Sequence, residues 1–420
     1  MLSVRHFFKI LFESRYVFLY TITERLFFFI VFLIFARNYS TEFYGQLIIV
    51  FTVSNITILF FDFGLPILLQ KEISANKKHA SEFLSISFFL SMFSFVFYFC
   101  IIYFYCYSFY SFLKPDLIIL VILNVFSYFI LNQLHSVLFA LSEFKKQFTI
   151  FIIFKIIILI IFSYGILIQN LDINWELLIL LIGNILNILI LFYFCSKRNI
   201  KLSSGYILKD NVLDKLKMAI PLGLAVIFNF MYDKIDIIIL SFFSNFSQVA
   251  FYNVGYGIYK ASSLSFSFLL IPALTRVTYL GRKTSAVKLF LKKYSFFLVY
   301  ISLVVGIILF FLSGIIINFL YTDKYIGSSL IIKILSFAII GLALNNLTGT
   351  ILNGLGLFKE NLYVTLSGLI MNIILNVIFI PNFGIIVPAA VTIITEYYIL
   401  MGDIIILNRY FKKTKINGNF

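Results

Sequence analysis

The feature that most constrains this chain is a succession of apolar runs about 20 residues long, separated by short polar segments. A helix of about 20 residues spans about 30 Å of hydrocarbon. Of the 420 residues, 62% are hydrophobic and 12% are charged, whereas roughly half of a soluble domain's surface faces water. The sequence therefore predicts an all-α integral membrane protein with twelve transmembrane helices. The expected spans are 16–36, 45–69, 83–105, 117–142, 148–169, 176–196, 216–243, 250–275, 294–320, 328–353, 362–380 and 386–408.

Basic residues predict the orientation of these spans. With the N-terminus inside, inner segments carry 25 of the 33 lysines and arginines, and outer loops carry only Arg37, Lys114 and Lys324. Such a bias places both termini on the cytoplasmic side. The net charge of +15 is then mostly a topology signal, and we expect no nucleic-acid partner. We interpret the first run as a retained span, since no small-residue cleavage site follows it.

Several classes of chemistry lack their signatures. Three cysteines and three histidines are scattered without metal-ligand or disulfide spacing, so we expect no metal. No G-x-x-x-x-G-K-[ST] loop is present, and we expect no ATP hydrolysis and no cofactor. The outer loops are too short for a catalytic domain. We therefore expect a protein that is not an enzyme.

The two halves of the chain resemble each other. Glu24-Arg25 corresponds to Asp233-Lys234, "NYSTEFY" (38–44) to "NFSQVAFY" (245–252), and Pro66 to Pro272, at nearly constant offsets. These matches predict two pseudo-symmetric six-helix lobes around a central cavity, residues 1–205 with spans 1–6 and residues 206–420 with spans 7–12. Internal repeats of this kind are typical of transporters, which bind their cargo near the membrane midplane.

Charged residues inside the spans indicate where cargo would bind. Each charge at the centre of a membrane helix costs about 2.5–3.5 kcal/mol on the insertion scale, so we expect these side chains to face a water-filled cavity. The alternative is salt bridges that hold helices together, such as Glu24 with Lys234. For Lys155, Lys333 and Asp403, which lie near span ends, extension of the side chain toward water is an equal alternative. The other charged residues within spans are Arg25, Lys260, Asp62, Asp233, Asp236 and Glu396.

Short motifs resemble the O-antigen flippase (Wzx-type) family, in the polysaccharide-transporter branch of the multidrug/oligosaccharidyl-lipid/polysaccharide exporters. The likeness is carried by Ala36-Arg37, Phe43-Tyr44-Gly45, Asp62-Phe63-Gly64-Leu65 with Lys71-Glu72-Ile73, and by "AIPLGL" (219–224), "FYNVGYGIYKA" (251–261) and "LNGLGLFKENLYVTLSGLIMNIILN" (352–376). It covers nearly the whole chain. The resemblance implies twelve spans in two lobes in the bacterial inner membrane. It also implies movement of undecaprenyl-pyrophosphate-linked oligosaccharide, an O-antigen or capsule repeat unit, from the inner to the outer leaflet.

On this hypothesis, cations would hold the pyrophosphate and acids would couple transport to H⁺ or Na⁺. The expected substrate-binding residues are Arg25, Lys155, Lys234 and Lys260. The expected ion-coupling or charge-pairing residues are Glu24, Asp62, Asp233, Asp236 and Glu396. A polysaccharide polymerase is an expected partner. A drug or metabolite/cation antiporter of the same superfamily stays open as an alternative, as does a membrane-embedded polysaccharide polymerase.

Overall fold

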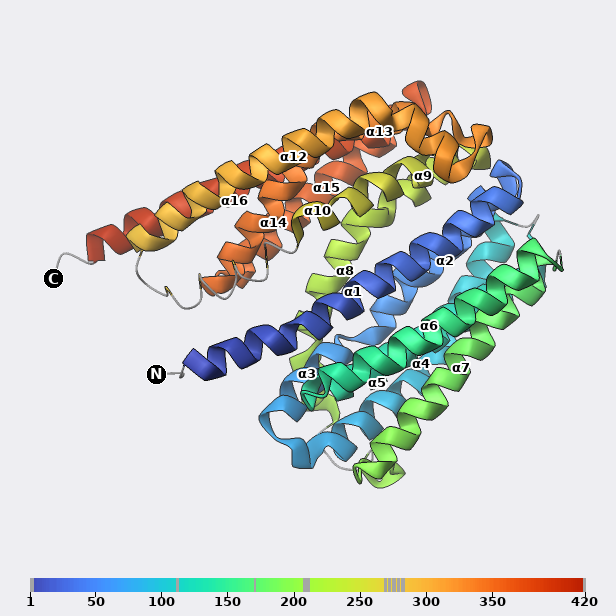
Figure 1. Ribbon diagram of the computed structural model, residues 1–420, viewed down its shortest axis with the longest axis horizontal. Helices are drawn as coiled ribbons and strands as arrows, with labels where there is room; N and C mark the ends of the chain where they lie inside the picture. The colour runs from blue at the N-terminus through green and yellow to red at the C-terminus, as the bar shows by residue number, and fades with distance from the viewer. Residues whose placement is uncertain are drawn as a thin grey trace. The chain divides into compact units, whose positions relative to one another are not determined.

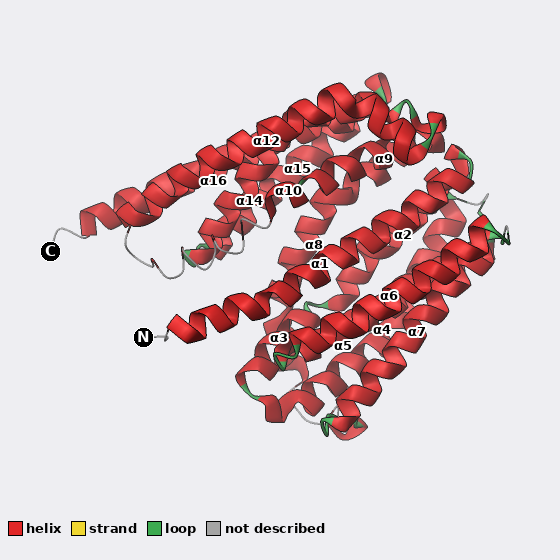
Figure 2. Ribbon diagram, in the orientation of Figure 1, coloured by secondary structure: helices red, strands yellow, loops and turns green. Residues whose placement is uncertain are grey.

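The computed structural model describes residues 4–110, 113–169, 171–206, 212–267 and 284–417, together with residues 270, 273, 277 and 280. Within these ranges the chain is helical and contains no strand (Figure 2). Pro272, which the repeat predicts to be equivalent to Pro66, lies outside the described residues.

The helices follow the predicted spans closely. Ten helical segments of the described part are long and apolar enough to cross a membrane. The predicted seventh and eighth spans correspond to α8, which carries the charges of residues 233–236, and to the 17-residue α9. The all-helical, multi-span prediction is confirmed. The long helices are α1 (Val4–Asn38), α2 (Thr41–Asp62), α4 (Ala80–Phe109), α5 (Pro115–Ala140), α6 (Phe144–Leu167), α7 (Ile173–Lys197), α8 (Val212–Phe243), α9 (Phe246–Ser262), α12 (Thr284–Tyr321), α14 (Ile339–Gly354), α15 (Phe358–Phe383) and α16 (Ile386–Asn417).

The predicted second span, 45–69, is wrong as a single helix. α2 ends at Asp62, and α3 (Leu65–Ala75) follows after a corner in which Phe63 and Gly64 have φ of 52° and 74°. A Cβ on Gly64 would lie 2.5 Å from the carbonyl oxygen of Ala219 and from the backbone nitrogen of Gly223. Glycine is required here because the left-handed backbone and the close approach of α8 both exclude a side chain.

Two other predicted spans are also interrupted. The tenth consists of α13 (Ser328–Leu335) and α14, joined by the 3₁₀ turn η4 (Ser336–Ala338). The eighth begins as α9, and after a turn at Ser263 the short α10 (Leu264–Ser267) follows. Short 3₁₀ turns η1 (Lys77–His79), η2 (Ser204–Tyr206) and η3 (Asp323–Tyr325) lie between longer helices.

The chain forms two compact units. Unit 1 comprises Met1–Asn38 and Val50–Ile227, and unit 2 comprises Tyr39–Ile49 and Phe228–Phe420. Helix α8 contributes its first half to unit 1 and its second half to unit 2. The predicted lobes, 1–205 and 206–420, describe the sequence repeat, and they remain a proposal.

Within unit 1, helices α4, α5, α6 and α7 lie side by side (Figure 1). Its core includes the buried Leu69, Leu131 and Leu191, where α3, α5 and α7 meet. In unit 2, α15 packs along α16, and α14 contacts both α12 and α16.

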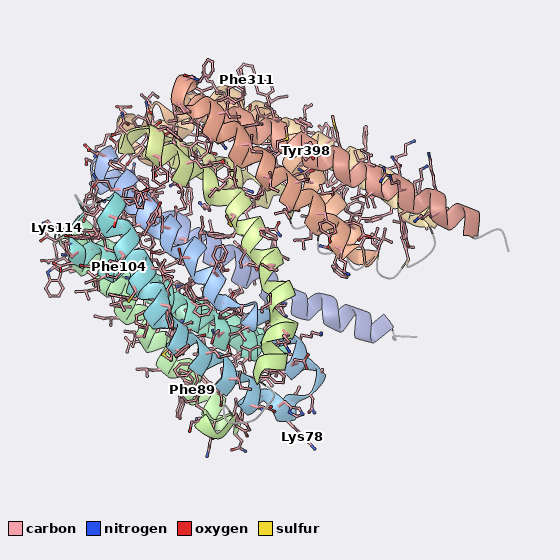
Figure 3. The ribbon with its side chains drawn as sticks, turned by 180° about the vertical axis from the view of Figure 1, so that it is seen from behind. Lys78, Phe89, Phe104, Lys114, Phe311 and Tyr398 are labelled. Carbon is pink, nitrogen blue, oxygen red and sulfur yellow. The ribbon has the colours of Figure 1, made fainter. Side chains whose placement is uncertain are left out.

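The outward surface of each unit suits a lipid environment. In unit 1, Lys78 and Lys114 lie at opposite ends of the helices, and Phe89 and Phe104 on α4 lie between them (Figure 3). Phe104 is 65% exposed, and Phe311 on α12 of unit 2 is 73% exposed. Large exposed apolar side chains between charged ends are expected of helices that face hydrocarbon.

Candidate functional site: charged clusters inside the two units

Lys155, on α6 of unit 1, is enclosed by aromatic rings. It is 3% exposed, and its Nζ lies 4.1 Å from the ring centroid of Phe27, 5.1 Å from Tyr128 and 5.4 Å from Phe151. An ammonium close to ring faces is attracted by their quadrupoles, and the attraction is strongest where water is excluded. The side chain is buried among the rings and does not extend to water, so the alternative interpretation of Lys155 as a side chain that reaches toward water is wrong.

An acidic residue near this lysine, Glu24, lies on α1 of unit 1. The Tyr128 hydroxyl donates a hydrogen bond to a carboxylate oxygen of Glu24, and the charges of Glu24 and Lys155 act on each other. Arg25, the next residue on α1, is exposed. The Lys155 cluster, defined as Arg25, Lys155, Glu24 and Tyr128, therefore combines two cations with one acid.

Asp62 does not belong to this group. It is 9% exposed at the end of α2, and one of its carboxylate oxygens has no hydrogen-bond partner. Its position at the left-handed corner before α3 gives it a structural setting different from that of Glu24.

Unit 2 holds a second group of charges, centred on α8 and α9. The Nζ of Lys260 lies 2.5 Å from Oδ1 of Asp233, and the Tyr256 hydroxyl donates to the same oxygen at 3.3 Å. These two charged side chains are 28% and 39% exposed. Lys234 lies 6.0 Å from the centroid of the Tyr256 ring.

One helical turn further along α8, Asp236 is buried in a hydrogen-bonded network. The Tyr252 hydroxyl donates to Oδ2 at 2.7 Å, and the Asn376 amide donates to Oδ1 at 2.9 Å. The same amide also donates to Oδ1 of Asn372 at 3.0 Å. The carboxylate is thus held by two elements, α9 and α15.

Glu396, on α16, is buried and accepts a hydrogen bond of 2.5 Å from the amide of Asn345 on α14. Asp403, on the same helix, is 1% exposed and accepts from the Thr348 hydroxyl at 2.6 Å. Asp403 therefore does not extend to water, whereas Lys333 is exposed, as the alternative interpretation allowed.

The two groups differ in the sign of their formal charge. The Asp236 cluster, defined as Asp233, Asp236, Glu396, Lys234 and Lys260, contains three acids and two lysines. The Lys155 cluster contains two cations and one acid. The Lys155 cluster is therefore the better environment for an anionic group, and the Asp236 cluster is the better environment for a cation.

Sequence reasoning missed several partners of these charges. Asn345 was not identified, although it is the amide that binds Glu396. Tyr252, Tyr256 and Tyr259 have i, i+4, i+7 spacing and share one face of α9, which was a usable signal for the Asp236 cluster.

Comparisons with known proteins agree with this architecture. An uncharacterized membrane protein of Methanocaldococcus jannaschii is 35% identical over 95 residues, which is 23% of this chain and 18% of that protein. The match thus spans less than a fifth of that relative's length.

Solved structures with the same fold are transporters by their descriptions. A multidrug resistance MATE family transporter of the MOP superfamily, in its inward-facing conformation, has a TM-score of 0.78 at 12% identity, covering 93% of this chain and 95% of that one. The lipid II flippase MurJ, in an inward closed conformation, has a TM-score of 0.68 at 19% identity, covering 97% and 90%. These likenesses establish the two-lobed fold.

The family match extends over more than half of the chain. Residues 13–279 match the family described as polysaccharide biosynthesis protein. They include α1, α5, α6 and α8, the helices that carry Glu24, Tyr128, Lys155 and Asp233. This chain therefore belongs to the polysaccharide biosynthesis protein family.

Proposed function

We propose that this protein is a flippase that moves undecaprenyl-pyrophosphate-linked oligosaccharide from the inner to the outer leaflet of the bacterial inner membrane by alternating access. The observation that carries the proposal is the excess of cations in the Lys155 cluster of unit 1, where Lys155 is buried and Arg25 is exposed. Membership of the polysaccharide biosynthesis family and the fold shared with MurJ support it.

The physical problem of such cargo is its head group. A polyprenyl tail stays in the bilayer, but a pyrophosphate with sugars loses its hydration there at a prohibitive cost. Arg25 can bind phosphate oxygens through two parallel hydrogen bonds, whereas Lys155, Lys234 and Lys260 act as point charges. Amides and hydroxyls near these cations would replace water around the sugars.

The acids of the Asp236 cluster supply the proposed coupling to H⁺ or Na⁺. Asp236 and Glu396 are buried with amide partners, and Asp233 is paired with Lys260. Binding of H⁺ or Na⁺ to the Asp236 cluster changes the net charge of the cluster. A resulting change in the Asp233–Lys260 ion pair then changes how readily the Lys260 ammonium can bind the cargo. Transport into sealed vesicles under an imposed H⁺ or Na⁺ gradient tests this step, and indifference to both gradients would refute it.

A cation-exporting antiporter is the second candidate, since the acids outnumber the lysines in the Asp236 cluster. The two functions differ in the charge of their cargo. Complementation of a flippase-deficient strain supports the flippase, and drug resistance without complementation supports the antiporter.

The substitutions Arg25→Ala and Lys260→Ala test the site in that strain. We expect both to lower surface polysaccharide without removing the protein from the membrane. Full activity in both variants would contradict the site assignment. The flippase proposal also predicts that both termini are cytoplasmic and that a polysaccharide polymerase receives the cargo.

A further inference from the structure

Unit 1 contains a polar cavity of about 240 Å³ beside the Lys155 cluster. It is lined by side chains from four helices, α1, α3, α5 and α6, all of which lie within unit 1. A liquid-water molecule occupies about 30 Å³, so this space is larger than a site for a single bridging water. The lining residues that matter for its chemistry are Tyr20, Glu24, Gln70, Asn132, His135 and Gln147.

Several of these polar groups are not used by the fold. His135 is 2% exposed, and neither ring nitrogen has a hydrogen-bond partner. Gln147 is 4% exposed, and the side chains of Gln147, Gln70 and Tyr20 form no hydrogen bond to any other described residue. A buried polar group without a partner costs about 1–3 kcal/mol, and both ring nitrogens of His135 are such groups. The convergence of these side chains on one cavity points to a ligand that would satisfy them.

Two other buried polar side chains of unit 1, Gln133 and Asn124, do form hydrogen bonds between helices. Gln133 lies on α5 between Asn132 and His135 in sequence, yet its amide donates to the Ser91 hydroxyl at 2.6 Å. Asn124 donates to the carbonyl oxygen of Leu177 at 2.9 Å. These hydrogen bonds connect helices, whereas the His135 ring contacts neighbouring helices through the rings of Tyr20 and Phe151.

We propose that this cavity is a subsite for an uncharged sugar ring, the sugar attached to the pyrophosphate of the cargo. The inference rests on the proposed function and names the sugar class that this protein accepts. Side-chain amides donate and accept hydrogen bonds at once, as sugar hydroxyls and acetamido groups do. The rings of Tyr20 and Phe139 add apolar surface for the sugar's C–H face.

The charge of the lining selects against acidic sugars. Glu24 is the charged residue in the lining, and no lysine or arginine is among the cavity's residues. A uronic acid would therefore place a second carboxylate beside that of Glu24, and two like charges repel each other.

The position of the cavity suits a sugar joined to a pyrophosphate. Tyr20 and Arg25 are five residues apart on α1, so they are separated by about 7.5 Å along the helix axis. Glu24 belongs to both the cavity and the Lys155 cluster. A pyrophosphate held by Arg25 would therefore present its first sugar to Gln70, His135 and Gln147.

The test measures binding to the purified protein in lipid nanodiscs. Three probes share one short polyprenyl chain: the pyrophosphate alone, pyrophosphate-linked N-acetylglucosamine and pyrophosphate-linked glucuronic acid. We expect the N-acetylglucosamine probe to bind about tenfold more tightly than the bare pyrophosphate, the effect of one or two net hydrogen bonds. The glucuronic acid probe is expected to bind no more tightly than the bare pyrophosphate.

Two variants then assign the preference to the cavity. Gln147→Leu and His135→Phe are each expected to bring the affinity for the N-acetylglucosamine probe down to that for the bare pyrophosphate, which itself stays unchanged. Gln133→Leu is the matched control on α5, because it removes a structural hydrogen bond and should keep the tenfold preference. His135→Phe preserves the ring contacts with Tyr20 and Phe151, so it serves if Gln147→Leu does not fold.

The outcomes separate the two proposals. Equal affinity of the wild-type protein for the bare and the N-acetylglucosamine probes would overturn the sugar subsite and leave the flippase proposal standing. An unchanged preference in both cavity variants would do the same. Binding of none of the three probes would overturn the flippase proposal and the subsite with it.

Discussion

The side-chain oxygens of Thr41 and Ser247 lie 3.0 Å apart and share a hydrogen bond, although 206 residues separate them in the sequence. Both belong to the turns that the repeat predicts to be equivalent, "NYSTEFY" and "NFSQVAFY". A Cβ on Gly45 would lie 1.9 Å from the carbonyl oxygen of Phe246, so the start of α2 lies directly against the start of α9 within unit 2. The two equivalent turns are thus in contact.

A disulfide between these turns is expected to stop transport. Alternating access, as proposed, must separate the turns on the predicted outer side before cargo can leave. Thr41→Cys and Ser247→Cys together, in a background lacking Cys100, Cys106 and Cys195, should cross-link on oxidation, since the side-chain atoms are already close. Oxidation should abolish flipping in proteoliposomes, and reduction should restore it.

Each single cysteine variant is the control for that experiment and should be insensitive to oxidant. Normal transport by fully cross-linked protein would show that the turns stay joined throughout the cycle.

Gly64→Ala is expected to destabilise the protein by at least about 1–3 kcal/mol, the range for strained backbone positions. The added Cβ meets backbone atoms of Ala219 and Gly223, and φ of 74° is unfavourable for alanine. Thermal unfolding in detergent, monitored by the exposure of cysteine thiols, measures the loss of stability. Gly257→Ala is the matched control, because nothing lies within 4 Å of its added Cβ, and it should leave the melting temperature unchanged or raise it. Similar melting temperatures for the two variants would contradict the role of the corner.

Lys155→Met is expected to fold and to lose flippase activity. Methionine fits among the rings of Phe27, Tyr128 and Phe151, and replacing a buried charge with an apolar side chain is often tolerated. The variant lacks the cation that is proposed to attract the pyrophosphate, and transport should therefore fail. Complementation of a flippase-deficient strain and membrane abundance of the variant are measured together.

Lys333→Met provides the comparison, since Lys333 is exposed and should retain activity on substitution. Wild-type complementation by Lys155→Met would remove Lys155 from the proposed site.

Asp236→Ala and Asn376→Ala are expected to destabilise unit 2 by about 1–3 kcal/mol each, because each leaves a buried polar group without its partner. They break the same hydrogen bond, from the Asn376 amide to Oδ1 of Asp236. The double variant should therefore lose less free energy of unfolding than the sum of the single losses. Denaturation of the single and double variants in one detergent gives the coupling energy. Additive losses would mean that the two residues act independently.

The sequence was sufficient to predict the helices but not their interruptions. Long apolar runs predicted where most of the membrane helices lie, because hydrocarbon thickness dictates such lengths, but the helices α1, α12 and α16 extend about ten residues beyond the predicted ends. The corner at Phe63 and Gly64 was missed, since its apolar residues continue the run and only the left-handed backbone ends the helix. Glycine is common inside membrane helices, so Gly64 by itself gave no signal.

The sequence predicted the charged residues of the candidate site but not the side chains that surround them. Glu24, Lys155 and Glu396 were identifiable because charges are rare within spans. Their partners Tyr128, Phe27 and Asn345 come from other helices, and no pattern within one span reports which helix is its neighbour. With 54 phenylalanines in the chain, the rings around Lys155 had no distinguishing position in the sequence.

The aromatic enclosure of Lys155 has a consequence for the energetics of the cycle. Its ammonium lost most of its water shell when α1, α5 and α6 packed together, long before any cargo arrives. The free-energy cost of desolvating that cation is therefore part of folding and does not recur each time a phosphate binds. Because the lysine is preorganised in this way, its own desolvation does not weaken the electrostatic attraction in the binding step.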